Sequence, residues 1–299
     1  MTNLKLTRRQ AIGAAALGAA LQAAGGGKSS RLSFEGYIWQ NLAARAKKPL
    51  ADMIDELFTT APYAGFENIE LNQGFFTPAL RDRVIGLTRK HTLQMPSVYV
   101  GGAMHEEALA ERTIASALEI GGICKEFGCT AIVNNPASKP QSALKSESEL
   151  ALQATLLNRM GQTLAGKGLQ LRMHHHAAEM LENAREWRHI LKHTDPKYVH
   201  LCIDLEHAHR SGVDPDALLR EAGKRTTEIH LRNQQKGVPT EALGEGDIDH
   251  VRIAATLREL KVSPLVVVEL AYHAETEITR DFRESLLLSR IYAETTFGV

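Results

Sequence analysis

The sequence predicts an α/β protein with one domain, a closed (β/α)₈ barrel that follows an N-terminal signal segment. Short apolar, β-rich runs alternate with amphipathic stretches, and there are eight such runs. This alternation is typical of parallel strands joined by crossover helices, and eight units in about 270 residues match a closed barrel. The runs are Leu32–Ile38, Asn68–Leu71, Gln94–Val100, Thr130–Asn134, Leu169–His174, Val199–Asp204, Glu228–Leu231 and Leu265–Leu270.

The stretches between the runs have helical periodicity. Three of them, Ala51–Phe58, Ser148–Leu164 and Asp249–Leu260, carry apolar stripes. Their stripes are formed by Met53, Ile54, Leu57 and Phe58, by Leu152, Leu156, Leu157, Met160 and Leu164, and by Val251, Ile253, Leu257 and Leu260. An open doubly wound sheet is the alternative, but no Gly-rich phosphate turn follows an early strand.

Composition and net charge limit the kinds of molecule that the protein is expected to bind. The 299 residues are 43% hydrophobic and 23% charged, as in ordinary globular proteins. Because 35 basic residues balance 35 acidic ones, a nucleic-acid partner has no electrostatic support. Of the three cysteines, Cys124 and Cys129 offer a disulfide or zinc pair as one alternative, but the favoured interpretation, for Cys202 too, is a small buried side chain.

Residues 1–27 have the pattern of an export signal. Arg8 and Arg9 precede the weakly apolar run Ala11–Ala24 and three glycines. This arrangement predicts a twin-arginine signal peptide and export to the periplasm, without a stable membrane anchor. A helical N-terminal extension is the alternative. We therefore expect the barrel domain to span residues 31–299.

Four successive predicted strands end in a polar residue that faces the barrel lumen. Strand residues alternate between the lumen and the surrounding helices, and barrel enzymes carry their active sites at the C-terminal ends of the strands. Buried carboxylates are costly unless they are paired or bind a metal. The pattern therefore predicts one divalent metal ion bound by His174, Asp204, His230 and Glu269.

The predicted ligand set contains two imidazoles and two carboxylates. Such a set suits Mn²⁺, Mg²⁺, Co²⁺, Fe²⁺ or Zn²⁺, and Mn²⁺ is our first choice. The alternative is that these residues are four unrelated polar strand ends that hydrogen-bond locally. Recurrence over four strands favours the metal.

Around these residues the chain resembles the xylose isomerase-like TIM-barrel superfamily, in its sugar phosphate isomerase/epimerase group. The resemblance runs from about residue 31 to the end. Its segments are Phe66–Leu71, His200–His207, Ser211–Pro215, Glu228–Asn233, Gly244–Asp249 and Val266–Leu270. It implies metal ligands at Asp204, His230 and Glu269, with His207 near the substrate.

The fifth predicted strand departs from the pattern of many epimerases in this group. They carry a glutamate where His174 stands, and use it as one of a pair of acid/base residues. The stretch His174–Glu179 resembles instead the His-x-His-x-x-Glu branch, and its three consecutive histidines resemble inosose dehydratase-like members. Only His174 and His176 share a face, so we expect His175 to pack behind the strand.

The remaining candidates are residues for proton transfer and substrate contact. We expect Glu269 or Glu179 as the base, and as proton donor His176, His207 or Glu245. Contacts to substrate hydroxyls are expected from Glu70, Tyr99, Asn134, Arg232 and Glu245. Ordinary packing in the lumen or the loops is the alternative for these contacts.

Together, these features predict a metal-dependent isomerase or epimerase that abstracts a proton next to a metal-bound carbonyl of a sugar or keto-sugar. One alternative is a lyase or dehydratase that eliminates from a 3-keto-glycoside or an inosose. Another is a non-catalytic periplasmic sugar-binding protein. An endonuclease IV-like DNA-repair role needs more metal ligands than the sequence offers. The expected partner is a small sugar, with a homo-oligomer left open.

Overall fold

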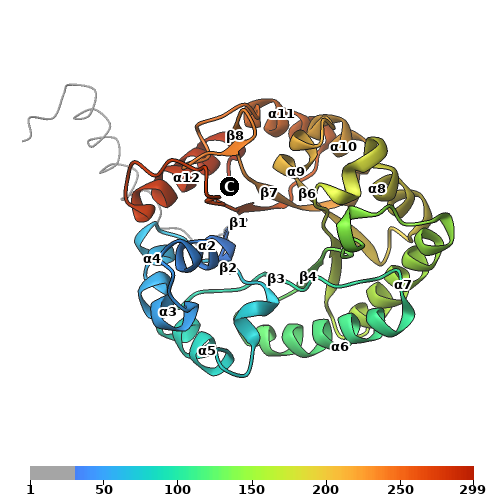
Figure 1. Cartoon of the computed structure of the whole chain (residues 1–299), viewed down its shortest axis with the longest axis horizontal. Coiled ribbons are helices and arrows are strands. Elements are labelled where there is room, and N and C mark those ends of the chain that lie inside the picture. The colour runs from blue at the N-terminus through green and yellow to red at the C-terminus, as the bar shows by residue number, and fades with distance from the viewer. Residues whose placement is uncertain (1–30) are drawn as a thin grey trace, which may run out of the picture. The chain divides into compact units, whose positions relative to one another are not determined.

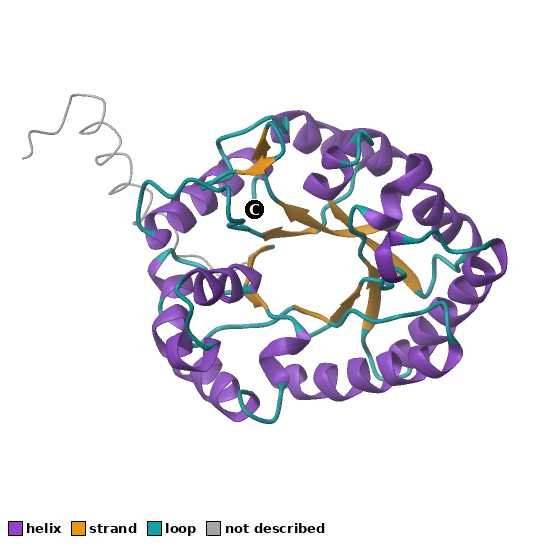
Figure 2. Ribbon diagram, in the orientation of Figure 1, coloured by secondary structure: helices purple, strands orange, loops and turns teal. Residues whose placement is uncertain are grey.

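The eight predicted parallel strands are present in a computed structural model, which describes residues 31–299. Seen down its axis, the domain is a ring of strands inside a ring of helices (Figures 1 and 2). The order around the sheet is β2-β1-β10-β7-β6-β5-β4-β3. The strands are β1 (Leu32–Glu35), β2 (Ile69–Glu70), β3 (Ser97–Tyr99), β4 (Ala131–Asn134), β5 (Gln170–Met173), β6 (Val199–Asp204), β7 (Thr226–Leu231) and β10 (Leu265–Val268).

The two ends of this sheet approach each other, so the predicted barrel fold is confirmed. Between β2 and β3 there are two isolated parallel bridges, Asn68 to Gln94 and Asn72 to Tyr99. Residues 31–299 form one compact unit. The predicted signal peptide, residues 1–27, lies outside the described residues.

Helices cover the outside of the barrel. They are α2 (Tyr37–Arg45), α3 (Leu50–Phe58), α4 (Thr60–Tyr63), α5 (Arg81–Lys90), α6 (Glu107–Cys124), α7 (Glu147–Ala165), α8 (Leu181–His193), α9 (Leu205–Arg210), α10 (Pro215–Ala222), α11 (His250–Leu260) and α12 (Phe282–Phe297). Local sequence sets some boundaries: α7 begins at a capping box, in which Ser146 and Glu149 each bind the other's backbone N–H. Among the described residues, no helix combines the length and apolarity needed to cross a membrane.

The first predicted strand, Leu32–Ile38, is longer than the strand in the structure. It ends at Glu35, and Tyr37 already belongs to α2. Gly36 permits this turn, because a Cβ at that position would lie 2.6 Å from Leu71 Cδ2. A small hairpin of β8 (Gln234–Gln235) and β9 (Val238–Pro239) follows β7 and was not predicted.

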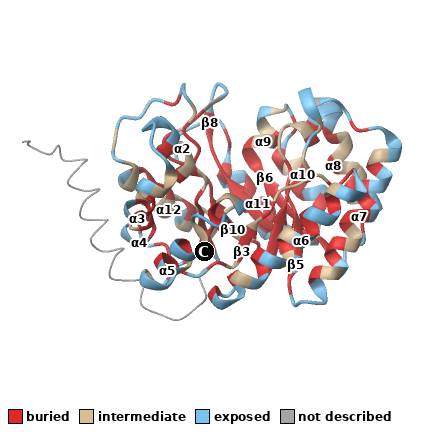
Figure 3. Cartoon of the chain, turned by 60° about the horizontal axis from the view of Figure 1, so that its bottom comes forward, coloured by how far each residue is buried: buried red, intermediate tan, exposed pale blue. Residues whose placement is uncertain are grey.

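Burial follows the layers, with the strands buried at the centre of the domain (Figure 3). Two residues of the predicted apolar stripes are not buried: Val251 is 63% exposed and Leu152 is 37% exposed. Both helices bury neighbouring positions of the same stripe instead, such as Ile253 and Leu157. The three cysteines are free and buried, as the favoured interpretation predicted.

Candidate active site

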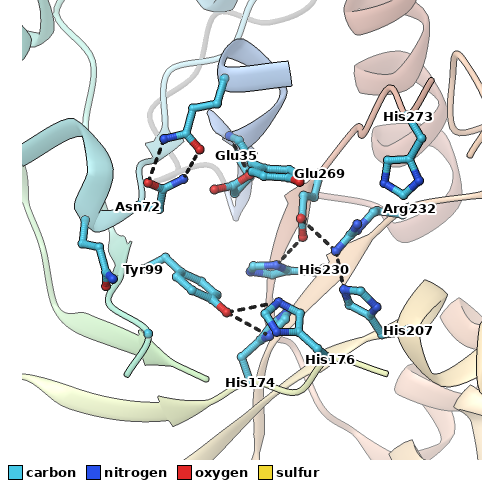
Figure 4. Close-up of a pocket in the computed structure, with 14 residues that line it drawn as sticks. Glu35, Asn72, Tyr99, His174, His176, His207, His230, Arg232, Glu269 and His273 are labelled. Carbon is cyan, nitrogen blue, oxygen red and sulfur yellow. Dashed lines mark hydrogen bonds and ion pairs between the residues drawn. The ribbon is translucent and has the colours of Figure 1, made fainter. Parts of the chain in front are cut away.

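A cavity of about 410 Å³ opens at the C-terminal mouth of the barrel (Figure 4). Its size is typical of a small-molecule site. Fourteen residues line it. They are Glu35, Tyr37, Gln40, Asn72, Gln73, Tyr99, Gly101, His174, His176, His207, His230, Arg232, Glu269 and His273.

The four predicted metal ligands come together, and three of them, His174, His230 and Glu269, line this cavity. Each offers one ligand atom, and these atoms lie within 4.8 Å of one another. Four neighbouring strands place them: Asp204 ends β6, His230 lies in β7, and His174 and Glu269 directly follow β5 and β10. Backbone bonds extend the ladder to the last two, from His174 N–H to Asn134 O and from Glu269 N–H to Leu231 O.

Helix α9 fixes the carboxylate of Asp204. Oδ1 of Asp204 accepts hydrogen bonds from the backbone N–H groups of Glu206 and His207, both at 2.9 Å, and so caps the helix. Its Oδ2 is left to face the site, 3.6 Å from His174 Nε2. Burial raises the pKa of Asp204, but the Arg232 guanidinium beside it outweighs burial and holds that pKa well below its usual value.

The two imidazoles differ in charge. His174 Nε2 is buried without a hydrogen-bond partner and faces Asp204. Burial lowers the pKa of His174 well below its usual value, so the ring is neutral and its lone pair is available. A buried, unsatisfied nitrogen among acidic oxygens fits a divalent cation.

His230 Nδ1 lies 2.8 Å from Glu269 Oε2. Burial lowers the pKa of His230, but Cys202, Glu70 and Glu228 outweigh it and raise that pKa well above its usual value, so a metal would have to displace a proton from this ring.

Arg232 lies between the two predicted carboxylate ligands. Its Nη2 donates to Asp204 Oδ2 at 3.1 Å and is 3.0 Å from Glu269 Oε1. The same nitrogen is 2.8 Å from His207 Nε2. The guanidinium therefore offsets part of the charge of the two carboxylates, and it would compete with a metal for their oxygens.

The floor beneath the cavity is a closed network of polar groups. The Ser97 hydroxyl lies 2.5 Å from Glu70 Oε2 and 2.9 Å from Glu228 Oε1, and Arg172 donates to Glu228 at 2.6 Å. Glu70 Oε1 is 3.2 Å from His230 Nε2. Glu70 is fully buried and does not line the cavity in this structure. It contacts His230, and its predicted contact with substrate stays a prediction.

Two further predicted residues, His176 and Tyr99, line the cavity. The Tyr99 hydroxyl is 3.4 Å from His176 Nε2 and 3.5 Å from His174 Nδ1. Burial lowers the pKa of His176 and raises that of Tyr99 well above its usual value. Both are therefore neutral in the resting site.

His207 also lines the cavity, but its protonation does not suit a proton donor. Burial lowers its pKa well below the usual value. Its Nε2 accepts a hydrogen bond from Arg232, so this nitrogen carries no proton to give.

Three predicted residues lie away from the cavity. Glu179 is buried behind it, where it accepts the backbone N–H of His176 at 2.6 Å and an N–H of Asn135 at 3.1 Å. Asn134 donates to the Val100 carbonyl, and Glu245 pairs with Arg280 on the exterior. None of the three lines the cavity, so base, donor and substrate-contact roles for them do not fit this position.

Other lining residues were missed. Glu35, the last residue of β1, obeys the same lumen-facing rule as the four ligands, and its strand-end position was the available signal. Gln40 and Asn72 lie side by side and exchange hydrogen bonds of 3.2 and 2.9 Å. Tyr37 and His273 lie on a helix and a loop, and strand periodicity says nothing about them.

Comparison with protein families agrees with this geometry. Residues 58–290 match the model of the xylose isomerase-like TIM barrel. The chain belongs to the xylose isomerase-like TIM-barrel family. Similar relatives of known name are inosose dehydratases. The one from Bacillus velezensis is 32% identical over 90 residues, 30% of each chain. The one from Salmonella typhimurium is 30% identical over 143 residues, 42% of this chain and 47% of that protein.

Solved structures with a similar fold include sugar isomerases and epimerases. A sugar phosphate isomerase/epimerase from Parabacteroides distasonis has a TM-score of 0.70 at 15% identity, covering 91% of this chain and 96% of that one. A 3-keto-D-glucoside 4-epimerase from E. coli has a TM-score of 0.64 at 18% identity, covering 89% and 100%. At these identities the likeness shows the fold. The curated relatives named above match over less than half of their own length.

Proposed function

We propose that this chain is a metal-dependent lyase that removes a proton next to the carbonyl of a cyclic keto-sugar or inosose and then eliminates a β-oxygen substituent. The observation that carries the proposal is the set of four ligand atoms, within 4.8 Å of one another, three of them on residues that line the cavity. A divalent ion held there would polarise a carbonyl oxygen and acidify the neighbouring C–H. The similarity to inosose dehydratases supports elimination.

The residues of the chain would divide the remaining tasks. Glu269 is the cavity carboxylate nearest the predicted metal and would take the proton from carbon. Arg232 would move from the carboxylates to a substrate oxygen once a metal neutralises them. Tyr99 and the amides of Gln40 and Asn72 would contact substrate hydroxyls.

An isomerase or epimerase is the second candidate. Strand β5 lies three strands from β10 around the barrel, so His176 faces Glu269 across the cavity. Epimerisation returns the proton on the opposite face of the substrate, and His176 would be the group to do so. Elimination is favoured because burial and Arg232 lower the pKa of His176, so the ring stores no proton at neutral pH.

Product analysis tests the proposal. The protein, loaded with Mn²⁺, is incubated with 2-keto-myo-inositol and with methyl 3-keto-β-D-glucoside, and the products are separated by mass. We expect an unsaturated ketone with release of water or methanol, and its loss after EDTA or in Glu269→Gln. An epimer of unchanged mass would support the second candidate. No product from either compound would reject both and leave a sugar-binding role.

A further inference from the structure

We propose that Glu35 is the proton donor to the leaving oxygen, paired with Glu269 as the base. This inference rests on the proposed lyase function and assigns the step that the function leaves open. Among the fourteen residues that line the cavity, Glu35 and Glu269 are the two that carry a carboxyl group.

The two carboxyls come from neighbouring strands in register. Strands β1 and β10 are parallel partners, with Phe34 opposite Val268. Glu35 and Glu269 follow these residues and both line the cavity (Figure 4). They therefore address the same side of a bound substrate. Elimination breaks bonds at two adjacent carbons, and two neighbouring carboxyls can serve one carbon each.

Their surroundings give the two carboxyls opposite roles. Glu269 lies 3.0 Å from the Arg232 guanidinium and 2.8 Å from His230, so its negative charge is compensated. Glu35 is only 3% exposed and forms no ion pair among residues 31–299. Burial without a direct ion pair favours the protonated form of a carboxyl. Burial, with Glu269 and Glu70 nearby, accordingly raises the pKa of Glu35 well above its usual value.

One oxygen of the Glu35 carboxyl is fixed by the backbone, and the other has no partner in residues 31–299. Its Oε2 accepts the backbone N–H of Tyr37 at 2.7 Å, which fixes the carboxyl group. Its Oε1 has no hydrogen-bond partner among the described residues and belongs to a side chain that lines the cavity. Among the histidines of the cavity, His207 is less suited, because its Nε2 accepts a hydrogen bond from Arg232.

The proposed elimination uses Glu269 as proton acceptor and Glu35 as proton donor. Glu269 takes the proton as the C–H bond next to the carbonyl breaks, and the electron pair forms an enolate. The enolate electrons then form the new C=C bond as the bond from the adjacent carbon to oxygen breaks. That oxygen takes the proton of Glu35 and leaves as water or an alcohol. Glu269 then loses its proton to solvent and Glu35 takes one up from solvent, which restores both carboxyls. No oxidant or reductant is needed.

The test compares proton exchange with elimination in Glu35→Gln. In D₂O, with Mn²⁺-loaded protein and methyl 3-keto-β-D-glucoside or 2-keto-myo-inositol, we expect the variant to exchange the substrate hydrogen within about threefold of wild type. Elimination of methanol or water should fall at least about 100-fold, as for loss of a general acid. With 4-nitrophenyl 3-keto-β-D-glucoside, whose leaving group needs no proton, elimination should recover to within about tenfold of wild type.

Glu119→Gln, which removes an exposed carboxyl on helix α6, is the matched control and should change none of these rates. Full elimination by Glu35→Gln would overturn the assignment, and so would equal loss of exchange and of elimination with both leaving groups, which indicates a structural role. If wild type exchanges and eliminates nothing, the proposed function itself fails, and the assignment fails with it.

Discussion

Arg232 is the residue on which the charge balance of the site depends. One nitrogen of its guanidinium reaches Asp204, Glu269 and His207 within 3.1 Å. A buried pair of carboxylates needs such a cation when no metal is bound. The arginine and the predicted metal thus satisfy the same oxygens and exclude each other in part.

Replacing this arginine should tighten metal binding. In Arg232→Gln the competing cation is gone, so we expect the Kd for Mn²⁺ to fall about tenfold, or roughly 1.4 kcal/mol. Titration calorimetry on metal-stripped protein measures it, with Arg280→Gln as the control because Arg280 pairs with Glu241 and Glu245 away from the cavity. An unchanged or weaker affinity would show that Arg232 supports the ligands and does not compete.

Much of the site was predictable residue by residue, because strand alternation decides which side chains enter the lumen. This rule brought together His174, Asp204, His230 and Glu269. Applied to the first strand, it also points to Glu35, which lines the cavity.

The rule could not tell which lumen-facing residues reach the cavity: Glu70 is buried and contacts His230 but does not line the cavity. The rule also could not place Glu179, which lies in the 3₁₀ helix Ala178–Met180 after β5, or Glu245, which lies in the loop after β9.

At the scale of elements, the loop after β7 is held by one asparagine and one glycine. Asn233 Oδ1 accepts the N–H groups of Gln234 and Ile248, and its Nδ2 donates to Leu243 O. Gly246 passes close by at φ +140°, and a Cβ there would lie 2.4 Å from Asn233 Oδ1. This packing holds the segment that follows Arg232.

Gly246→Ala should therefore destabilise the domain. We expect a loss of about 2 kcal/mol or more in the free energy of unfolding, from the strained φ together with the clash. Gly212→Ala is the control: it has φ +74°, but nothing lies within 4 Å of the added Cβ, so a loss of about 1 kcal/mol is expected. Urea denaturation of both variants measures the difference, and equal losses would show that the contact with Asn233 does not matter.

At the scale of the whole molecule, the order of elements was the easiest feature to predict and their boundaries the hardest. Eight parallel strands follow from the alternation of apolar runs, whereas the short β2 and β3 are defined by pairing that the sequence does not display. The sequence also does not show that Val251 is exposed. Neighbouring positions of its helix stripe compete for one buried face, and packing decides which of them is buried. Export through residues 1–27 stays a prediction.

The folded domain also holds histidines neutral, which ties its stability to pH. His250 is fully buried and donates to the Arg232 carbonyl at 3.1 Å. Burial lowers its pKa from 6.5 to about 4. Between these values the unfolded chain binds a proton that the folded chain does not, so stability falls as the pH drops through this window.

Removing His250 should flatten this dependence. In His250→Gln, the loss of unfolding free energy between pH 7 and about pH 4 should shrink by about 3 kcal/mol relative to wild type, because the neutral amide binds no proton in either state. Chemical denaturation across this range measures it, and His91→Gln, at a less buried histidine, is the control. Parallel curves for wild type and His250→Gln would contradict the assignment of a neutral buried His250.

The central claim is that one divalent ion is held by His174, Asp204, His230 and Glu269. Titration calorimetry of metal-stripped protein with Mn²⁺ tests it most directly. We predict one ion per chain in wild type and an affinity at least about 100-fold weaker in His174→Gln and in Asp204→Asn, with circular dichroism unchanged. No binding by wild type, or undiminished binding by both variants, would contradict the claim.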